Sequence, residues 1–134
     1  MQLTKQTDYS LRILMYLGLK KNGLTTIEEV CRAYDLSIGH TMKLVNELSK
    51  AGYISTIRGR GGGFRLAVCP SEINIGDVFR STEKNLSLVE CFQSDSNRCP
   101  LSDMCILSNI FHRALGSFLA VLDDYTLQDL LRPQ

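Results

Sequence analysis

Three of the five cysteines in this chain, Cys91, Cys99 and Cys105, lie within fifteen residues of one another. The residues between them are mainly polar, as in a surface loop. Thiolates gathered this closely suit a soft metal ion or an iron–sulfur cluster. Three is an incomplete set, because a closed four-cysteine site needs another thiolate and disulfides need an even number. The sequence therefore predicts a metal-binding or redox-active loop whose fourth ligand comes from elsewhere.

The other two cysteines and the remaining motifs do not extend this site. Cys31 and Cys69 lie outside the cysteine-rich stretch, and we interpret them as packing residues. The chain has no Cys-x-x-Cys motif and no nucleotide-binding fingerprint. We therefore do not expect an enzyme.

The charges divide the chain into a basic and an acidic half. Residues 1–66 contain ten Lys or Arg and five Asp or Glu, whereas residues 67–134 contain five and nine. The length of 134 residues and a hydrophobic content of 44% are typical of a globular protein with a real core. A basic half joined to an acidic half favours a polyanion as the partner of the first half alone.

The N-terminal residues contain no apolar signal-peptide core, and no apolar run approaches the roughly 18 residues of a membrane span. We therefore expect a cytoplasmic protein without a membrane partner. In that reducing compartment a cysteine cluster binds metal or reacts more often than it forms disulfides.

Helical periodicity predicts three helices in the basic half, near residues 4–20, 25–35 and 38–51. The second and third are joined by a short turn, which is typical of a helix-turn-helix. Polar residues of the third helix could reach base edges and phosphates in a major groove. The candidates for these DNA contacts are Ser37, His40, Thr41 and Lys43. Two ordinary packed helices remain the alternative.

Two β-branched and aromatic runs follow, at residues 53–58 and 64–67, and a glycine-rich tip separates them. Arg58, Arg60 and Arg65 lie on or beside this tip, where they suit a narrow, negatively charged minor groove. A glycine-rich loop can also hold a nucleotide phosphate, but that site needs a helix after the loop, and here a strand follows. The pattern favours a winged helix-turn-helix.

The acidic half predicts a short helix from residue 74 or 75 to about 81, a short strand at residues 86–89 and a long helix at residues 102–122. The long helix is apolar on too many sides for a surface helix, so one face could cover a partner helix in a homodimer. A fully buried helix in a monomer is the alternative. A final short helix spans residues 125–131.

The expected fold class is mainly α with a small β-hairpin, a winged helix-turn-helix plus a long C-terminal dimerisation helix. We divide the chain into a DNA-binding domain at residues 1–80, a cysteine-containing loop at 81–105, and the dimerisation and C-terminal helices at 106–134.

With these parts in place, the chain resembles the Rrf2 family of bacterial winged-helix regulators over essentially its whole length. The matching stretches are residues 3–12, 48–53, 58–66 and 75–78, together with the three cysteines. Residues 86–91, the cysteine spacing and residues 122–130 are most similar to the nitric-oxide-sensing repressors of the family. The resemblance implies a homodimer that binds a double-stranded DNA operator and holds an iron–sulfur cluster.

The resemblance also implies the ligands of that cluster. Cys91, Cys99 and Cys105 would be the thiolates, and Asp8 of the opposite subunit would complete the site. The iron–sulfur-biogenesis branch instead has a His three residues after its third cysteine, where this chain has Ser108. His112 is expected to face the dimer or solvent. We favour a 4Fe–4S cluster over a 2Fe–2S cluster.

The function implied is a repressor that releases DNA when nitric oxide nitrosylates or removes the cluster. Two alternatives stay open: a family regulator that senses redox or iron–sulfur status, and a repressor that works by thiol oxidation without a cluster. A zinc ion bound by the three cysteines with Asp8 or a His is a further alternative for the site.

Overall fold

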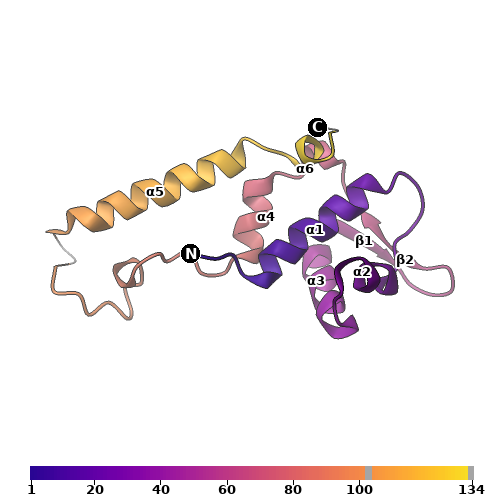
Figure 1. The fold of residues 1–134 in the computed structure, drawn as a ribbon, viewed down its shortest axis with the longest axis horizontal. Coiled ribbons are helices and arrows are strands. Elements are labelled where there is room, and N and C mark those ends of the chain that lie inside the picture. The colour runs from indigo at the N-terminus through magenta and orange to yellow at the C-terminus, as the bar shows by residue number, and fades with distance from the viewer. Residues whose placement is uncertain (102–103, 133–134) are drawn as a thin grey trace.

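The computed structural model describes residues 1–101 and 104–132, which form eight helices or strands and two short 3-10 turns. In chain order these are α1 (Lys5–Leu19), α2 (Ile27–Tyr34), α3 (Ile38–Lys50), β1 (Ile54–Ile57), β2 (Gly63–Leu66), η1 (Pro70–Glu72), α4 (Ile75–Thr82), η2 (Glu90–Phe92), α5 (Ile106–Asp123) and α6 (Leu127–Leu130). In Figure 1, α5 runs away from the body formed by the other elements.

Local capping chemistry sets the limits of the helix-turn-helix. Thr26 and Glu29 form a capping box at the start of α2. Asp35, with a φ of 52°, ends α2 in a left-handed conformation. Ser37 then caps α3 by accepting a hydrogen bond from the backbone N–H of His40 at 3.2 Å. The predicted turn between these two helices is confirmed.

The two strands form the predicted antiparallel hairpin, in which Ile54 pairs with Leu66 and Ile57 with Gly63. Thr25 extends this sheet, because its backbone exchanges hydrogen bonds of 2.9 and 2.8 Å with Phe64. The start of α2 is thereby fixed to the wing.

The hydrophobic core joins the helix-turn-helix, the hairpin and α4. Its fully buried members include Ile13, Leu14, Val30, Leu44, Leu48, Ile73, Val78 and Leu127. The last of these comes from α6, so the C-terminus returns to the N-terminal domain, as Figure 1 shows. Residues 1–80 therefore do not supply the whole core of this domain.

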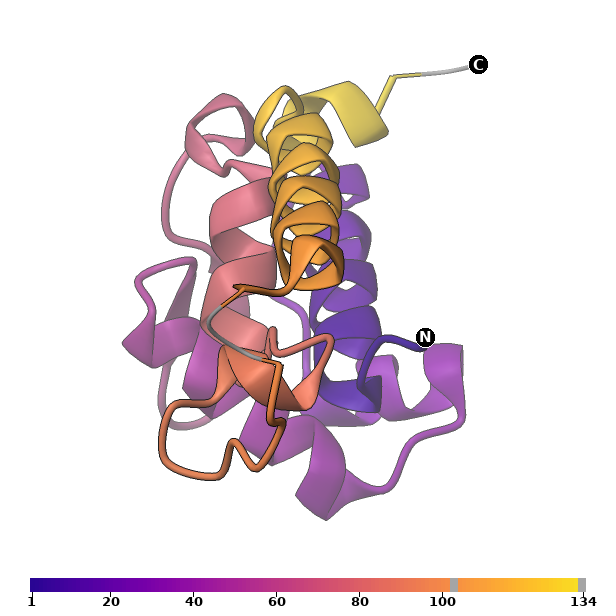
Figure 2. The same ribbon diagram turned by 90° about the vertical axis from the view of Figure 1, so that its left-hand side faces the viewer.

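The long helix α5 is attached to α4 near its C-terminal end. Arg80 on α4 donates two hydrogen bonds to the Asp123 carboxylate, at 2.6 and 2.7 Å. Phe79 packs edge-on against Phe118 with ring centres 5.3 Å apart. Figure 2, which looks along α5, shows α4 next to it and the cysteine loop beneath its start.

No residue of α5 is buried in the single chain. The apolar side chains of Ile106, Leu107 and Ile110 are 75%, 56% and 53% exposed. The alternative of a fully buried monomer helix is therefore wrong. The helix begins at Ile106, while Ser102, the expected start, lies outside the described residues.

Two other expectations need correction. Residues 86–89 form no strand and do not join the sheet of β1 and β2. The last helix is shorter than expected, at Leu127–Leu130. Within the described part of the chain, no helix is both long and apolar enough to cross a membrane.

α4 packs so closely against the end of α5 that adding one methyl group between them should destabilise the fold. A Cβ on Gly76 would overlap Oδ1 of Asp123, which Arg80 holds in place. We expect Gly76→Ala to lower the free energy of unfolding by about 1–3 kcal/mol, as overpacking does. Urea unfolding at fixed protein concentration measures this change.

Gly39→Ala is the matched control, because nothing lies within 4 Å of the place that its new methyl group would take and its helix favours Ala. It should leave stability unchanged or raise it by up to about 1 kcal/mol. Equal stability of the two variants would contradict the packing described for Gly76.

Candidate functional site

The three clustered cysteines line a single cavity of about 200 Å³ at the start of α5. The remaining lining residues are Val89, Glu90, Leu107, Ser108 and Phe111. All three thiols are free and partly buried. The fold thus brings together side chains that the sequence placed in one loop, and encloses them in largely apolar walls.

Short-range contacts position this loop against α5. Phe92, which follows Cys91 in η2, stacks on His112 with ring centres 3.8 Å apart. The Cys91 thiol lies 3.5 Å from the hydroxyl of Ser108 and donates to it. His112 therefore stacks on an aromatic ring and does not line the cavity, whereas Ser108 lies on the cavity wall.

The polar part of the loop satisfies its own backbone. The Glu90 carboxylate accepts a 2.8 Å hydrogen bond from the backbone N–H of Arg98, and the Asn97 side chain accepts one of 3.0 Å from that of Cys99. Cys105 precedes the first turn of α5. Each cysteine is thus placed by a different local element: a 3-10 turn, a polar turn and a helix start.

The donor set fits a soft metal ion or an iron–sulfur cluster. A zinc ion needs all its ligand atoms about 2.0–2.3 Å from one point. A cluster carries several irons, so its cysteine ligands need not converge on a single point. Three thiols around a partly apolar cavity meet that requirement.

Asp8 does not line the cavity of its own chain. It lies in the first turn of α1, where its carboxylate accepts two hydrogen bonds of 2.9 Å from Arg12. Its side chain is 43% exposed and is open to a second molecule. A single chain therefore supplies three thiols to the cavity but not Asp8.

The helix that carries Asp8 is in direct contact with α2 and α3. The Arg12 guanidinium lies over the ring of Tyr9, which in turn packs edge-on against His40 of α3 at 6.0 Å. The Tyr34 hydroxyl of α2 donates a 2.8 Å hydrogen bond to the backbone carbonyl of Arg12. Asp8 is thus linked to α3 through two intervening side chains, those of Arg12 and Tyr9.

The structure corrects one predicted DNA contact on α3. Thr41 is fully buried; its hydroxyl donates to the carbonyl of Ser37 at 3.0 Å and accepts from the Cys31 thiol. It cannot reach a groove, because it faces α2. Ser37 and Lys43 are exposed, and His40 is partly exposed beside Tyr9.

A groove of about 400 Å³ separates α3 from the wing and contains residues that were not predicted as DNA contacts. Met42 is 49% exposed and lines this groove with Asn46 and Arg58. Asn46 follows Met42 by one helical turn, so the two side chains share a face of α3. That spacing could have placed them together from the sequence. Arg58 and Arg60 are exposed on the wing.

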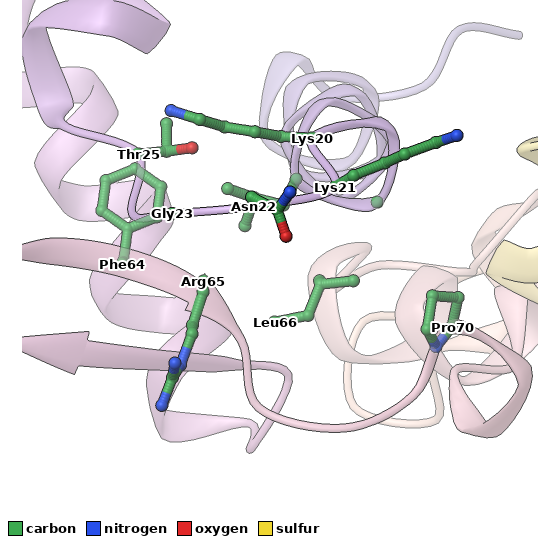
Figure 3. Close-up of a pocket in the computed structure, with 11 residues that line it drawn as sticks. Lys20, Lys21, Asn22, Gly23, Thr25, Phe64, Arg65, Leu66 and Pro70 are labelled. Atoms are coloured by element: carbon green, nitrogen blue, oxygen red, sulfur yellow. The ribbon is translucent and has the colours of Figure 1, made fainter.

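Arg65 is also exposed, but it faces a different cavity of about 410 Å³ beside the loop between α1 and α2. Lys20 and Lys21 line the same cavity, and Lys20 is already paired with Glu29 at 2.8 Å. Figure 3 shows the ends of the two lysines and of Arg65 pointing in different directions. These cations do not converge, so they do not form an anion site.

The two remaining cysteines differ from each other. Cys31 is partly buried and bonded to Thr41, as expected for a packing residue. Cys69 is exposed before η1, so the interpretation as a packing residue is wrong for it.

Comparison with known proteins identifies relatives along the whole chain. Residues 3–133 match the Rrf2 family, described as an iron-dependent transcriptional regulator. The chain is 52% identical over 132 residues to the HTH-type transcriptional regulator NsrR of Halalkalibacterium halodurans, covering 98% of this chain and 90% of that protein. It is 47% identical over 133 residues to the regulator of the same name in Bacillus subtilis, covering 98% and 91%.

Solved structures share the fold. Oxidized CymR of Staphylococcus aureus is 26% identical with a TM-score of 0.78, covering 100% of this chain and 98% of that one. IscR of T. potens is 23% identical, also with a TM-score of 0.78, covering 98% and 86%. The expected fold class is confirmed, and the relatives are named as transcriptional regulators, a class without enzymatic activity.

The burial of Thr41 predicts a stability effect without a DNA effect. Thr41→Val removes the hydroxyl that bonds Ser37 and Cys31, so the free energy of unfolding should fall by about 1–2 kcal/mol. Affinity of the folded protein for a duplex selected from a random library should stay within about twofold.

Lys43→Ala is the comparison variant on the same helix. Lys43 is exposed, so its removal should change stability by less than about 0.5 kcal/mol while weakening DNA binding. A Thr41→Val protein that folds normally but binds DNA tenfold more weakly, a loss of about 1.4 kcal/mol, would show that Thr41 does contact DNA.

Proposed function

The chain belongs to the Rrf2 family of transcriptional regulators, and on that premise we propose that it is a homodimeric DNA-binding repressor whose iron–sulfur cluster senses nitric oxide. The observation that carries this proposal is the cavity lined by Cys91, Cys99 and Cys105 at the start of an uncovered α5.

The DNA-binding part of the proposal uses α3 and the wing. Ser37, His40 and Lys43 lie on or beside the exposed side of α3. Met42 and Asn46 line the groove next to the wing. An Asn side chain can read an adenine edge, and exposed arginines suit phosphates or a minor groove. Arg58, Arg60 and Arg65 are the proposed wing contacts.

The dimer part of the proposal follows from α5. An exposed stripe of apolar side chains on an 18-residue helix needs a cover, and a second copy of the helix has a matching surface. Two copies related by a twofold axis would also present two α3 helices to two half-sites of an operator.

The cofactor part of the proposal assigns the three thiolates of one subunit and Asp8 of the other as ligands of a 4Fe–4S cluster. When bound, such a cluster supplies iron to which nitric oxide can bind. Arg12 donates one hydrogen bond to each Asp8 oxygen in the single chain, and both oxygens keep lone pairs for a further ligand bond. Gain or loss of that bond would act on Arg12, whose contacts with Tyr9 and Tyr34 reach α3 and α2.

Anaerobic purification tests this function. We expect iron and acid-labile sulfide in the protein, a visible absorption band, and tight binding to a library-selected duplex that is lost when nitric oxide bleaches the band. A hundredfold loss of affinity corresponds to about 2.7 kcal/mol. Zinc without sulfide would contradict the cluster, and colourless protein that releases DNA only on thiol oxidation would establish a thiol repressor. DNA release by oxidants but not by nitric oxide would establish a redox-status sensor.

A pair of cysteine variants sharpens the same test. Cys91→Ala removes a thiol from the cavity and should abolish cluster binding and the response to nitric oxide. Cys69→Ala removes an exposed thiol outside the cavity and should leave iron, sulfide and the response unchanged. Equal iron contents in the two variants would contradict the assignment of Cys91 as a ligand.

A further inference from the structure

The first turn of α1 is held by a carboxylate from the far end of α4. Oε2 of Glu83 accepts hydrogen bonds from the backbone N–H of Thr4 at 3.1 Å, from the Thr4 hydroxyl at 3.0 Å and from the Thr7 hydroxyl at 2.7 Å. Thr7 is fully buried, and Thr4 is the N-cap of α1. One carboxylate oxygen thus bonds both Thr4 and Thr7 at the first turn of α1, which also carries Asp8.

A carboxylate suits this place for electrostatic reasons. The first turn of a helix has unpaired N–H groups and a partial positive charge, which an anion compensates. Burial works to raise the pKa of Glu83, but the hydrogen bonds from Thr7 and Thr4 outweigh it and lower the pKa. Glu83 is therefore ionised at neutral pH and interacts favourably with the start of α1.

Glu83 also lies at a junction between the two parts of the molecule. It ends α4, which is clamped to α5 through Arg80 and Asp123, and it begins the connection that leads to Cys91. On the other side of the anchored turn, the Gln6 side chain donates a hydrogen bond to Glu47 of α3. The first turn of α1 is therefore bonded to α3 and to the end of α4, where the segment that leads to Cys91 begins.

We propose that Glu83 is a positioning residue that holds Asp8 where the partner subunit's cluster can take it as a ligand. The same hydrogen bonds make the first turn of α1 move together with α4. Forming or breaking the bond between Asp8 and the cluster then shifts α3 instead of fraying the start of α1. This inference rests on the proposed function, since it gives a role to Glu83 only if Asp8 is a ligand.

The test compares Glu83→Ala, Asp8→Ala and the double variant as anaerobically purified full-length proteins. Iron and sulfide content, the visible circular dichroism of the cluster, and duplex affinity with and without cluster are measured for each. Glu83→Ala should keep the three thiolates, yet its visible spectrum should shift to that of Asp8→Ala. The affinity ratio between cluster-bound and cluster-free protein should fall by about fivefold or more, the lower end of ordinary coupling.

The double variant separates positioning from simple destabilisation. If Glu83 acts through Asp8, the double variant should match Asp8→Ala in spectrum and affinity ratio, because the two effects are not additive. Asp77→Ala is the matched control: it removes an exposed carboxylate from the same helix and should behave as the unaltered protein. Glu83→Gln keeps an oxygen acceptor and should retain most of the coupling.

Three results would overturn the inference. One is a normal spectrum and affinity ratio in Glu83→Ala while Asp8→Ala is altered, which leaves the proposed function intact. Another is a double variant whose affinity ratio lies below that of Asp8→Ala by the full effect of Glu83→Ala. If Glu83→Ala does not fold, Thr7→Val removes the 2.7 Å hydrogen bond to Glu83 and the 3.1 Å one between the Thr4 and Thr7 hydroxyls, while Thr4 keeps both of its bonds to Glu83. An unchanged spectrum in that variant would be the third. No change in Asp8→Ala itself would instead reject Asp8 as a ligand.

Discussion

The arrangement of this protein depends on a helix that its own domain cannot cover. No residue of α5 is buried, and the Arg80–Asp123 pair and the contact of Phe79 with Phe118 attach the helix to the body near its C-terminal end. Its free start carries the wall of the cysteine cavity. The apolar surface that favours a second copy therefore adjoins the cavity whose thiols favour a cluster.

This constraint explains why the ligand set is incomplete in one chain. The cavity gathers three thiols, while the candidate fourth ligand, Asp8, lies on α1 in an ion pair with Arg12. In a dimer built on α5, the first turn of α1 from one subunit could approach the cavity of the other. The cluster would then connect the subunits, and its chemistry would act on the helix that touches α3 through Tyr9 and His40.

The sequence predicts those parts of the structure that depend on local chemistry. The turn between α2 and α3 and the glycine-rich wing depend on neighbouring residues, so their positions were predicted correctly. Thr41 was predicted on the DNA-facing side but is buried, because its hydroxyl bonds the carbonyl four residues earlier. Contacts between residues far apart in the chain, such as that of Glu83 with Thr7, leave no local pattern.

The central claim is that one subunit's cysteines share a cluster with the other subunit's Asp8, and mixed dimers test it most directly. Two differently tagged variants, Asp8→Ala and Cys91→Ala, are co-expressed, and the mixed dimer is purified anaerobically with both tags. Sharing between subunits leaves one complete ligand set in the mixed dimer, so it should bind one cluster with the visible spectrum of the unaltered protein. A mixed dimer that only averages the spectra and iron contents of the two parent homodimers would contradict the account.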